Sequence, residues 1–306
     1  MGDLALRQAT EADDGAIRAV IAAAFPGNPK ASAGITAWQY WDNPFGPTQA
    51  FVWEDDGRVV ASFAAFAMPA VLDGREATIG NGVDLAVDPT YRGRQLSAGL
   101  ADAVYAAAAG EGMAVTVSFI NNPLAMRATG RAGWREVAKL GIWVLAVDDR
   151  FLASRLHVPT GAAGLVRRVA WRPGRGVEAD RSTVVPSGID ALWARSGGVT
   201  TGVAHTQAWW DWRFGGHPDH PYTYLSVEVD GQLHAAAVAA VREAFVGHHL
   251  QQVDEAAAER FSDRGYRDGT QLPARLDPKP TSFGAAAHTD PMPLSWSISW
   301  CDLDNV

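Results

Sequence analysis

Apolar and polar residues follow strand and helix periods in turn over the first 150 residues. Alternating apolar runs predict strands at 4–10, 50–68, 75–87, 113–119 and 138–147. The run at 50–68 contains Asp56 and Gly57, a pair that favours a hairpin turn. Apolar residues at helical spacing predict helices at 11–25, 97–112 and 122–134. This order predicts an α/β fold class, with an α+β mixed sheet, for residues 1–150.

The pattern of the first domain starts again after a change in composition. Arginine, glycine and proline become frequent at 151–180, which we interpret as a connector. The stretch 212–241 then repeats the features of 38–66 in order: a tryptophan two residues before an aromatic residue, a proline, an Asp-Gly turn and a small-residue strand. We therefore expect residues 181–306 to be an incomplete copy of the front of the first domain. The alternative is that Asp-Gly hairpins recur by chance.

Charge and cysteine content narrow the class of protein. The formal net charge of −8 argues against a general nucleic-acid binder. The single cysteine, Cys301, has no partner for an internal disulfide, which fits a reducing compartment. The first residues lack the pattern of a signal peptide, and no apolar run is long enough to span a bilayer. We expect a cytoplasmic protein with neither a membrane nor a nucleic acid as partner.

The stretch VDLAVDPTYRGRQLSAGL, residues 83–100, leads from an apolar strand through a basic turn into a helix. Free N–H groups at a helix start, together with the helix dipole, form a site for phosphate. Arg92 and Arg94 add positive charge, and Gly93 allows close approach of the backbone. The alternative is an ordinary strand-to-helix turn with solvated arginines.

Two sequence blocks in this half occur together in a known superfamily. The first consists of Val87, Pro89 and Tyr91 followed by a basic, glycine-containing loop. The second is Asn122-Pro-Leu-Ala125 followed by Gly133-Trp134. With these blocks the chain resembles the GNAT superfamily of acyl-CoA-dependent N-acyltransferases. The resemblance implies a GNAT fold in the N-terminal half, followed by a second, incomplete GNAT-like half.

The resemblance also implies a cosubstrate site for an acyl-CoA, with acetyl-CoA the expected donor and no metal. Three strand residues would pair with the pantetheine arm and bind the acyl carbonyl, and six loop residues would hold the pyrophosphate through their backbone amides. The second block would contact the cosubstrate near its sulfur or pantetheine end. The implied residues are Leu85, Ala86 and Val87; Arg92, Gly93, Arg94, Gln95, Leu96 and Ser97; and Asn122 and Ala125.

Two departures from the family pattern bear on activity. Gln95 and Ser97 stand where the loop usually has small residues, and Gln95 is the larger change. The loop amides would still bind phosphate if φ stays negative at Gln95. Thr129 stands where many family members have a tyrosine that protonates the leaving CoA thiolate, and a threonine hydroxyl is a poor general acid.

Asp84 is the candidate general base, because it lies on the strand that leads to the loop. The alternative is a carboxylate paired with a backbone N–H or an arginine. Weaker candidates for an acceptor pocket are Trp38, Asn81, Ser118, Asn121 and Trp212, although packing between the two halves is the simpler role for the tryptophans. His217 and His220 do not have the spacing of metal ligands.

We expect an N-acetyltransferase that moves an acyl group from acetyl-CoA, or another acyl-CoA, to the amine of a small molecule or natural product by direct attack in a ternary complex. Residues 181–306 would cap the acceptor cleft. The alternative is a non-catalytic acyl-CoA-binding protein, a sensor or partner protein, which Gln95 and Thr129 favour. A third possibility is different acyl-thioester chemistry at the same site.

Overall fold

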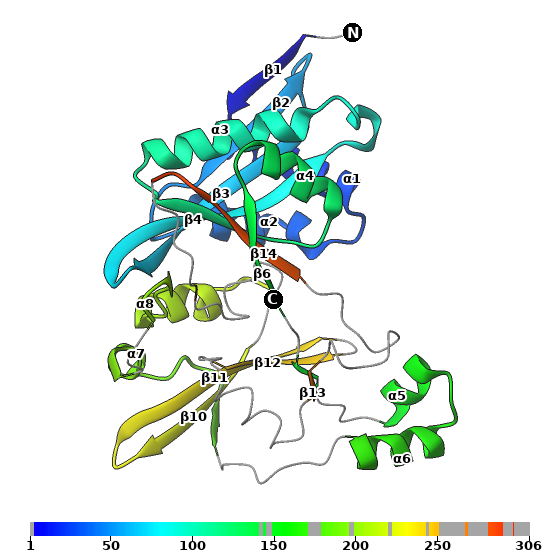
Figure 1. Cartoon of the computed structure of the whole chain (residues 1–306), viewed down its shortest axis with the longest axis vertical. Helices are drawn as coiled ribbons and strands as arrows, with labels where there is room; N and C mark the ends of the chain where they lie inside the picture. The colour runs from blue at the N-terminus through cyan, green and yellow to red at the C-terminus, as the bar shows by residue number, and fades with distance from the viewer. Residues whose placement is uncertain are drawn as a thin grey trace.

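In the structure, a computed structural model, the two larger β-sheets lie one above the other, with helices beside both (Figure 1). It describes residues 3–140, 143–144, 149–170, 179–195, 199–219, 222–242, 245–250, 267–268, 281–289 and 296. None of the described helices is long and apolar enough to cross a membrane.

The first sheet has eight strands, seven of them in the order β1-β2-β3-β4-β5-β14-β6, while the eighth, β9, pairs with β3. All pairs but one are antiparallel, and β4 and β5 run parallel, so the sheet is mixed as expected. Its strands are β1 (Leu4–Gln8), β2 (Gln49–Asp55), β3 (Arg58–Leu72), β4 (Arg75–Val87), β5 (Val115–Ile120), β6 (Arg135–Leu140), β9 (Gly202–Val203) and β14 (Thr281–Ala287).

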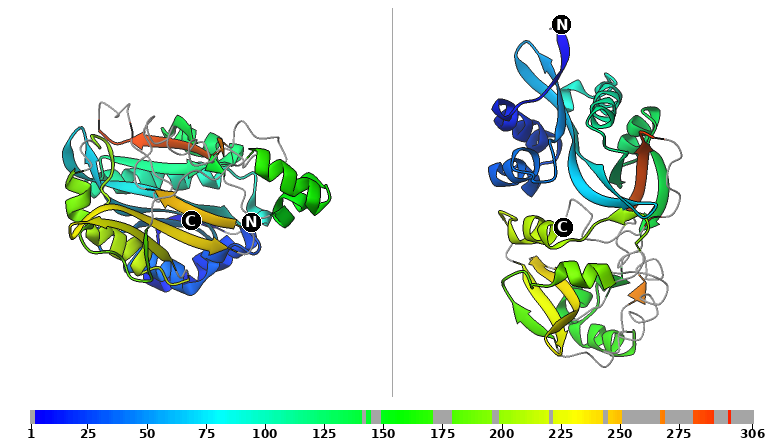
Figure 2. Two further views of the ribbon diagram at one scale, coloured as in Figure 1. Left: turned by 90° about the horizontal axis from the view of Figure 1, so that it is seen from below. Right: turned by 90° about the vertical axis from the view of Figure 1, so that its left-hand side faces the viewer.

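Helices cover both faces of this sheet (Figure 2). On one face lie α1 (Asp14–Ala24), α2 (Ala33–Thr36) and the π-helical turn η3 (Ala37–Trp41). On the other face lie α3 (Leu96–Gly110) and α4 (Pro123–Arg131). Short 3₁₀ turns, η1 (Glu11–Asp13), η2 (Pro29–Ala31) and η4 (Pro89–Tyr91), connect these elements.

The predicted final strand of the first domain is interrupted. Residues 135–140 form β6, and β7 (Trp143–Val144) pairs instead with β13 (Arg267–Asp268) in a separate two-stranded sheet. The expected connector contains two helices, α5 (Asp149–Leu156) and α6 (Thr160–Ala170), that pack against each other.

The second sheet repeats the strand order of the front of the first. Its order, β8-β10-β11-β12, corresponds to β1-β2-β3-β4, and every pair in it is antiparallel. The strands are β8 (Asp180–Ser182), β10 (Thr223–Val229), β11 (Gln232–Arg242) and β12 (Phe245–Leu250). Helix α7 (Ile189–Arg195), helix α8 (Gln207–Trp210) and the π-helical turn η5 (Asp211–Gly215) precede the β10–β11 hairpin.

The two hairpins match residue for residue. We call residues 32–66 the first unit and residues 206–240 the second unit. β2 begins at 49 and β10 at 223, while β3 begins at 58 and β11 at 232, so both pairs lie 174 residues apart, the separation between Trp38 and Trp212. Each hairpin has a register shift at the same point, after Trp53 or Val227, and an Asp-Gly turn with positive φ.

The C-terminal half also contributes strands to the first sheet. β9 extends the edge of β3 through the pairs Ala70–Val203 and Val71–Gly202. β14 lies between β5 and β6, antiparallel to both, where the orange strand crosses the upper sheet in Figure 1. The strand pattern of the sequence does not predict this insertion, and because β14 comes from residues 281–287, a boundary at residue 150 does not separate the two larger sheets.

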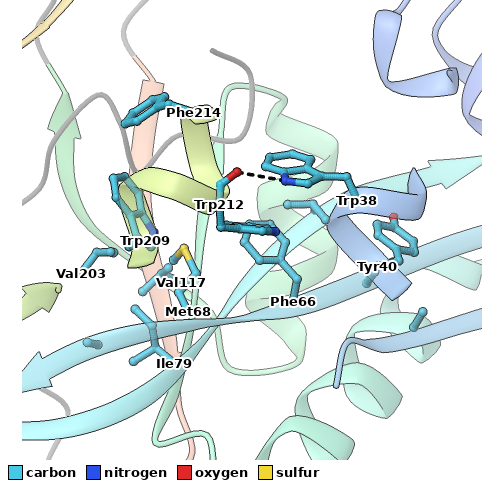
Figure 3. Packing of buried hydrophobic residues seen from close by; sticks show 14 of the residues in the cluster. Trp38, Tyr40, Phe66, Met68, Ile79, Val117, Val203, Trp209, Trp212 and Phe214 are labelled. Carbon is cyan, nitrogen blue, oxygen red and sulfur yellow. Dashed lines mark hydrogen bonds between the residues drawn. The ribbon is translucent and has the colours of Figure 1, made fainter. Parts of the chain in front are cut away.

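Aromatic residues join the two units. The indole rings of Trp38 and Trp212 stack with centroids 4.6 Å apart, and the Trp38 Nε1–H donates to the Trp212 carbonyl oxygen over 3.1 Å (Figure 3). Phe45 and Phe66 pack around Trp212, and all four residues belong to one apolar cluster that spans both halves. Counterpart residues of the two units therefore face each other across the junction.

Candidate active site

The two parallel strands β4 and β5 stay together for only a short distance. They pair at Gly80–Thr116 and Asn81–Val117, and no pairing between them continues beyond this point, although β4 runs on to Val87 and β5 to Ile120. The backbone edges of both strands are therefore left without strand partners on the sides that face each other. We call this divergence the β4–β5 gap.

A bulge in β4 lies beside the gap. The pairing of β4 with β3 shifts between Ala64–Val83 and Ser62–Ala86, and Asp84, inside the bulge, has a φ of 56°. A left-handed backbone at a residue other than glycine costs energy, so the surrounding structure must hold it in place. Extra residues of this kind in a strand redirect side chains and backbone groups.

The Asp84 carboxylate is buried in a polar cluster. Its Oδ2 accepts a hydrogen bond from the Tyr40 hydroxyl at 2.9 Å, and its Oδ1 lies 3.5 Å from the Lys30 Nζ. The side chains of Lys30 and Asp84 are 9% and 5% exposed, so the ion pair is nearly closed to water. Asp84 is thus paired with a lysine and a tyrosine, rather than with the backbone N–H or arginine considered above.

Burial changes the proton affinity of the partners of Asp84. It lowers the pKa of Lys30, against the attraction of Asp84, and the nearby Arg213 lowers it further. Burial and the negative charge of Asp84 together raise the pKa of the Tyr40 hydroxyl well above its usual value. Arg213 is buried too and comes from the second unit, so both halves contribute charge to this cluster.

The predicted phosphate turn begins a helix whose first turn has no side-chain cap. Gly93 has a φ of 83° and Gln95 a φ of 59°, and Gln95 makes no side-chain hydrogen bond to α3. The condition that φ stays negative at Gln95 is therefore not met. Gln95 instead takes the backbone conformation that glycine adopts most readily. Ser32, Thr206 and Asn122, by contrast, cap α2, α8 and α4 with their side chains.

Two contacts fix this turn from the neighbouring strand β2. The Trp53 Nε1–H donates to the Leu96 carbonyl oxygen over 3.0 Å, and the Tyr91 hydroxyl donates to Asp55 Oδ2 over 2.7 Å. The Arg94 guanidinium lies 4.6 Å from the centroid of the Tyr91 ring. Arg92 and Arg94 are both exposed beside the start of α3, where the dipole and the arginines attract anions together.

The second predicted block forms the start of α4. The Asn122 side chain accepts a hydrogen bond from the Leu124 N–H at 2.9 Å and is exposed. Thr129 is buried, and its hydroxyl donates to the Ala125 carbonyl oxygen over 2.9 Å within the same helix. A hydroxyl engaged in this way is a poor proton donor for a ligand, which agrees with the departure noted from the sequence.

Residues 5–137 match the family model of the acetyltransferase (GNAT) domain. The chain contains a GNAT domain. No curated protein matches the sequence.

Solved structures share the fold over nearly the whole chain. A GCN5-related N-acetyltransferase from Anabaena variabilis aligns with a TM-score of 0.61 at 10% identity, covering 94% of this chain and 73% of that one. A probable N-acyltransferase from Enterococcus faecalis aligns with a TM-score of 0.60 at 11% identity, covering 93% and 72%. A putative acetyltransferase from Pyrococcus horikoshii has a TM-score of 0.56 at 10% identity, covering 93% and 89%. At these identities the likeness establishes the fold alone.

The weaker pocket candidates lie in different environments around the GNAT domain. Trp38 and Trp212 are 8% exposed and stack on each other, so each covers a face of the other ring. Asn81 is buried with its amide near the Met68 sulfur, and Asn121 is exposed. Ser118 is buried at the gap. Of the two histidines, His217 packs on Trp38, and His220 lies outside the described residues.

Three residues of the GNAT domain near the gap were missed by sequence reasoning. Lys30 lies in a Pro/Gly-rich break with no periodic pattern, and Tyr40 was noted only as part of the repeat. Tyr105 occupies an apolar position of α3 and would be assigned to the core. The only available signal was their chemistry, because a lysine or tyrosine within an otherwise apolar surrounding needs a partner.

Proposed function

We propose that the protein is an acyl-CoA-dependent N-acyltransferase that uses acetyl-CoA to acetylate the amine of a small molecule. The observation that carries this proposal is the β4–β5 gap, which has a bulge beside it and an uncapped helix start at its end. An acyl-CoA bound between the two strands would have its phosphates at the start of α3 and its acyl group at the bulge. The acetyltransferase family of residues 5–137 supports the same reaction.

The gap supplies binding groups of two kinds. β4 continues past its pairing with β5 through Leu85, Ala86 and Val87, and its backbone groups alternate between β3 and the gap. Those that face the gap are suited to an amide-rich arm such as pantetheine, because they would otherwise lack strand partners. The amides from Arg92 to Ser97, with the two arginines, are still suited to a pyrophosphate. The positive φ at Gly93 and Gln95 does not exclude this, because turns that alternate right- and left-handed backbone also form anion-binding concavities. A backbone N–H aimed at the acyl oxygen would polarise the carbonyl where negative charge develops.

Asp84 is the group that accepts the amine proton in this proposal. The amine nitrogen forms a bond to the acyl carbon, the carbon–sulfur bond breaks, and sulfur leaves with the electron pair. Lys30 and Tyr40 hold the carboxylate in one orientation, as the distances of 3.5 and 2.9 Å indicate. Positioned general bases of this type contribute about 10²- to 10⁴-fold in rate.

The acceptor would enter on the face that carries Asp84, Lys30 and Tyr40. The second unit covers this face through the Trp38–Trp212 stack and brings Arg213 close to Lys30. A covered approach favours a small molecule or natural product over a protein tail. In this proposal residues 181–306 cap the acceptor cleft.

Calorimetry with acetyl-CoA tests the proposal first. We expect micromolar binding by the wild type and a loss of about tenfold or more in the double variant Arg92→Gln/Arg94→Gln, because charge-assisted contacts to phosphate are lost. The matched control is Arg75→Gln/Arg181→Gln, which removes two exposed arginines elsewhere. The control should bind as the wild type does.

An amine panel then separates catalysis from binding alone. Release of CoA with at least one amine establishes the transferase, whereas binding without release from any amine favours the alternative of an acyl-CoA sensor or partner protein. If the wild type does not bind acetyl-CoA at all, the proposal is wrong. If the double variant binds acetyl-CoA as tightly as the control does, Arg92 and Arg94 do not contribute to the binding site.

A further inference from the structure

We infer that Ser118 and Tyr105 form the side of the site that binds the leaving thiolate. This inference rests on the proposed function, since it concerns the sulfur atom released when the carbon–sulfur bond breaks. In many family members a tyrosine at the position of Thr129 protonates the leaving thiolate, whereas here the Thr129 hydroxyl donates to the Ala125 carbonyl oxygen of its own helix over 2.9 Å.

The Ser118 hydroxyl lies at the point where β4 and β5 part. The last paired residues are Asn81 and Val117, so Gly82 and Ser118 are the first residues beyond the pairing. A Cβ on Gly82 would lie 2.4 Å from the Ser118 Oγ and 3.1 Å from the Phe63 ring. The absence of a side chain at Gly82 therefore gives the hydroxyl its place directly over the β4 backbone.

Ser118 and Tyr105 share an unusual property for buried hydroxyls. Ser118 is 2% and Tyr105 5% exposed, and neither hydroxyl has a hydrogen bond of regular geometry within the described structure. They lie close to each other: Ser118 lowers the pKa of the Tyr105 hydroxyl, while burial, the larger effect, raises it above its usual value. Buried polar groups without full partners are costly and call for an explanation.

A negatively charged sulfur at the gap would provide the missing partner. Ser118 would donate its O–H to the thiolate, and Tyr105 would donate to the Ser118 oxygen. Because burial raises the pKa of Tyr105, the phenol keeps its proton and acts as a hydrogen-bond donor rather than as a full acid. Donors shielded from water stabilise a developing charge more strongly than donors in water.

The two sides of the sheet then have separate tasks. Asp84, Lys30 and Tyr40 belong to the face covered by α1 and α2, where the amine loses its proton. Tyr105 comes from α3 on the opposite face, where the sulfur leaves. The amine proton goes to Asp84, the electron pair of the broken bond stays on sulfur, and the hydroxyl pair binds that sulfur.

The test measures the pKa of the thiol of bound CoA, so it needs no acceptor amine. Calorimetry compares CoA with an analogue in which hydrogen replaces the thiol, from pH 7 to pH 9. If the thiol has the pKa of about 8.5 that is ordinary for cysteine and the site lowers it by one unit, CoA affinity relative to the analogue rises roughly sixfold over this range. We expect this rise in the wild type, its loss in Ser118→Ala and its partial loss in Tyr105→Phe.

Thr116→Val is the matched control. It removes another buried hydroxyl from the same strand, two residues before Ser118, whose partner is His288 Nε2 at 2.8 Å. The control should keep the rise with pH. Unchanged binding of the sulfur-free analogue shows that each variant is folded, and Tyr105→Phe provides the test should Ser118→Ala fail to fold.

The outcomes separate this inference from the proposed function. If neither CoA nor its analogue binds to the wild type, the proposed function fails and takes the inference with it. If both bind but the rise with pH is absent from the wild type, or is kept in both Ser118→Ala and Tyr105→Phe, the hydroxyl pair does not bind sulfur. The proposed function would survive that second result.

Discussion

The first and second units have the same hairpin but lead into different structures. Both have a capped helical turn, a π-helical turn, an Asp-Gly hairpin and a bulge at the same step. After the first unit, β4 is bulged at Asp84 and runs parallel to β5 before the two separate. After the second, β12 pairs with β11 through Phe245–Arg242 to Leu250–Ala237 without a register shift.

The hairpin is therefore a scaffold that both units share, and the proposed chemistry depends on the segment that follows it. The shared turn chemistry and small-residue strands are sufficient to form four antiparallel strands twice. The contacts from β2 that fix the turn at residues 91–96 have no equivalent in the second unit. Trp53 and Asp55 hold that turn, and their counterparts 174 residues later are Val227 and Val229, which have neither an indole N–H nor a carboxylate.

The largest expected effect comes from breaking the contact between the units. Trp212→Ala removes a buried ring that Trp38, Phe45 and Phe66 surround, and should lower the free energy of unfolding by about 3–5 kcal/mol. The control is Trp41→Ala, a half-buried tryptophan whose counterpart is Gly215. Urea unfolding followed by circular dichroism measures both. Equal losses would show that the stack does not hold the units together.

Removing the charge of Asp84 tests the feature that follows the first unit. Asp84→Asn keeps the shape but cannot accept a proton, so acyl transfer to an amine found in the panel should fall by about 10²-fold or more. Acetyl-CoA affinity should change little. Asp56→Asn, at the exposed hairpin turn, is the control and should keep wild-type turnover. Full turnover in Asp84→Asn would show that the carboxylate is not the general base and has only a structural role.

Much of this comparison could be predicted from the sequence, because it depends on local signals. The Asp-Gly turns, the alternation of apolar residues and the small-residue strands predicted both hairpins. The turn from 92 to 97 was placed at the start of α3, where the structure has it. These features need only neighbouring residues, so a pattern in one sequence is enough to find them.

The long-range features could not be predicted in this way. The sequence Thr281–Ala287 is compatible with a strand, but nothing in it specifies insertion between β5 and β6, which end more than a hundred residues earlier. The Lys30–Asp84 pair likewise joins an irregular segment to a strand. Strand partners and buried ion pairs depend on the assembled fold, and local periodicity carries no information about them.

The Lys30–Asp84 pair should give the protein a pH dependence with no equivalent in the second half, because the residue 174 positions after Lys30 is Ala204. The pKa of Lys30 is lowered in the folded state, so the unfolded chain binds its proton more tightly. Stability should therefore rise with pH from the lowered folded pKa up to the ordinary value of about 10.4, with a slope of at most about 1.4 kcal/mol per pH unit. Above pH 10 the raised pKa of Tyr40 acts in the opposite direction.

Unfolding free energies from pH 7 to pH 10 measure this slope. Lys30→Met should flatten it, since the methionine has no proton to lose. Lys139→Met, at an exposed position of β6, is the control and should keep the wild-type slope. A slope that persists in Lys30→Met would have to come from another group, and the ion pair would then have no measurable effect on stability in this range.

The smallest expected effect concerns the residue that departs most from the family pattern. Gln95 has a φ of 59°, a conformation that costs a side-chain-bearing residue about 1–2 kcal/mol and glycine much less. Gln95→Gly should therefore stabilise the protein by about 0.5–1 kcal/mol, after the greater freedom of glycine in the unfolded chain is subtracted. Gln95→Ala is the matched control and should not gain stability, because alanine is also unfavourable at positive φ.

Thermal unfolding measures the stability of both variants, and acetyl-CoA calorimetry should show equal or tighter binding in Gln95→Gly. If Gln95→Gly and Gln95→Ala both bind acetyl-CoA more weakly than the wild type, the glutamine side chain itself takes part in binding, and the sequence departure is a contact rather than a cost.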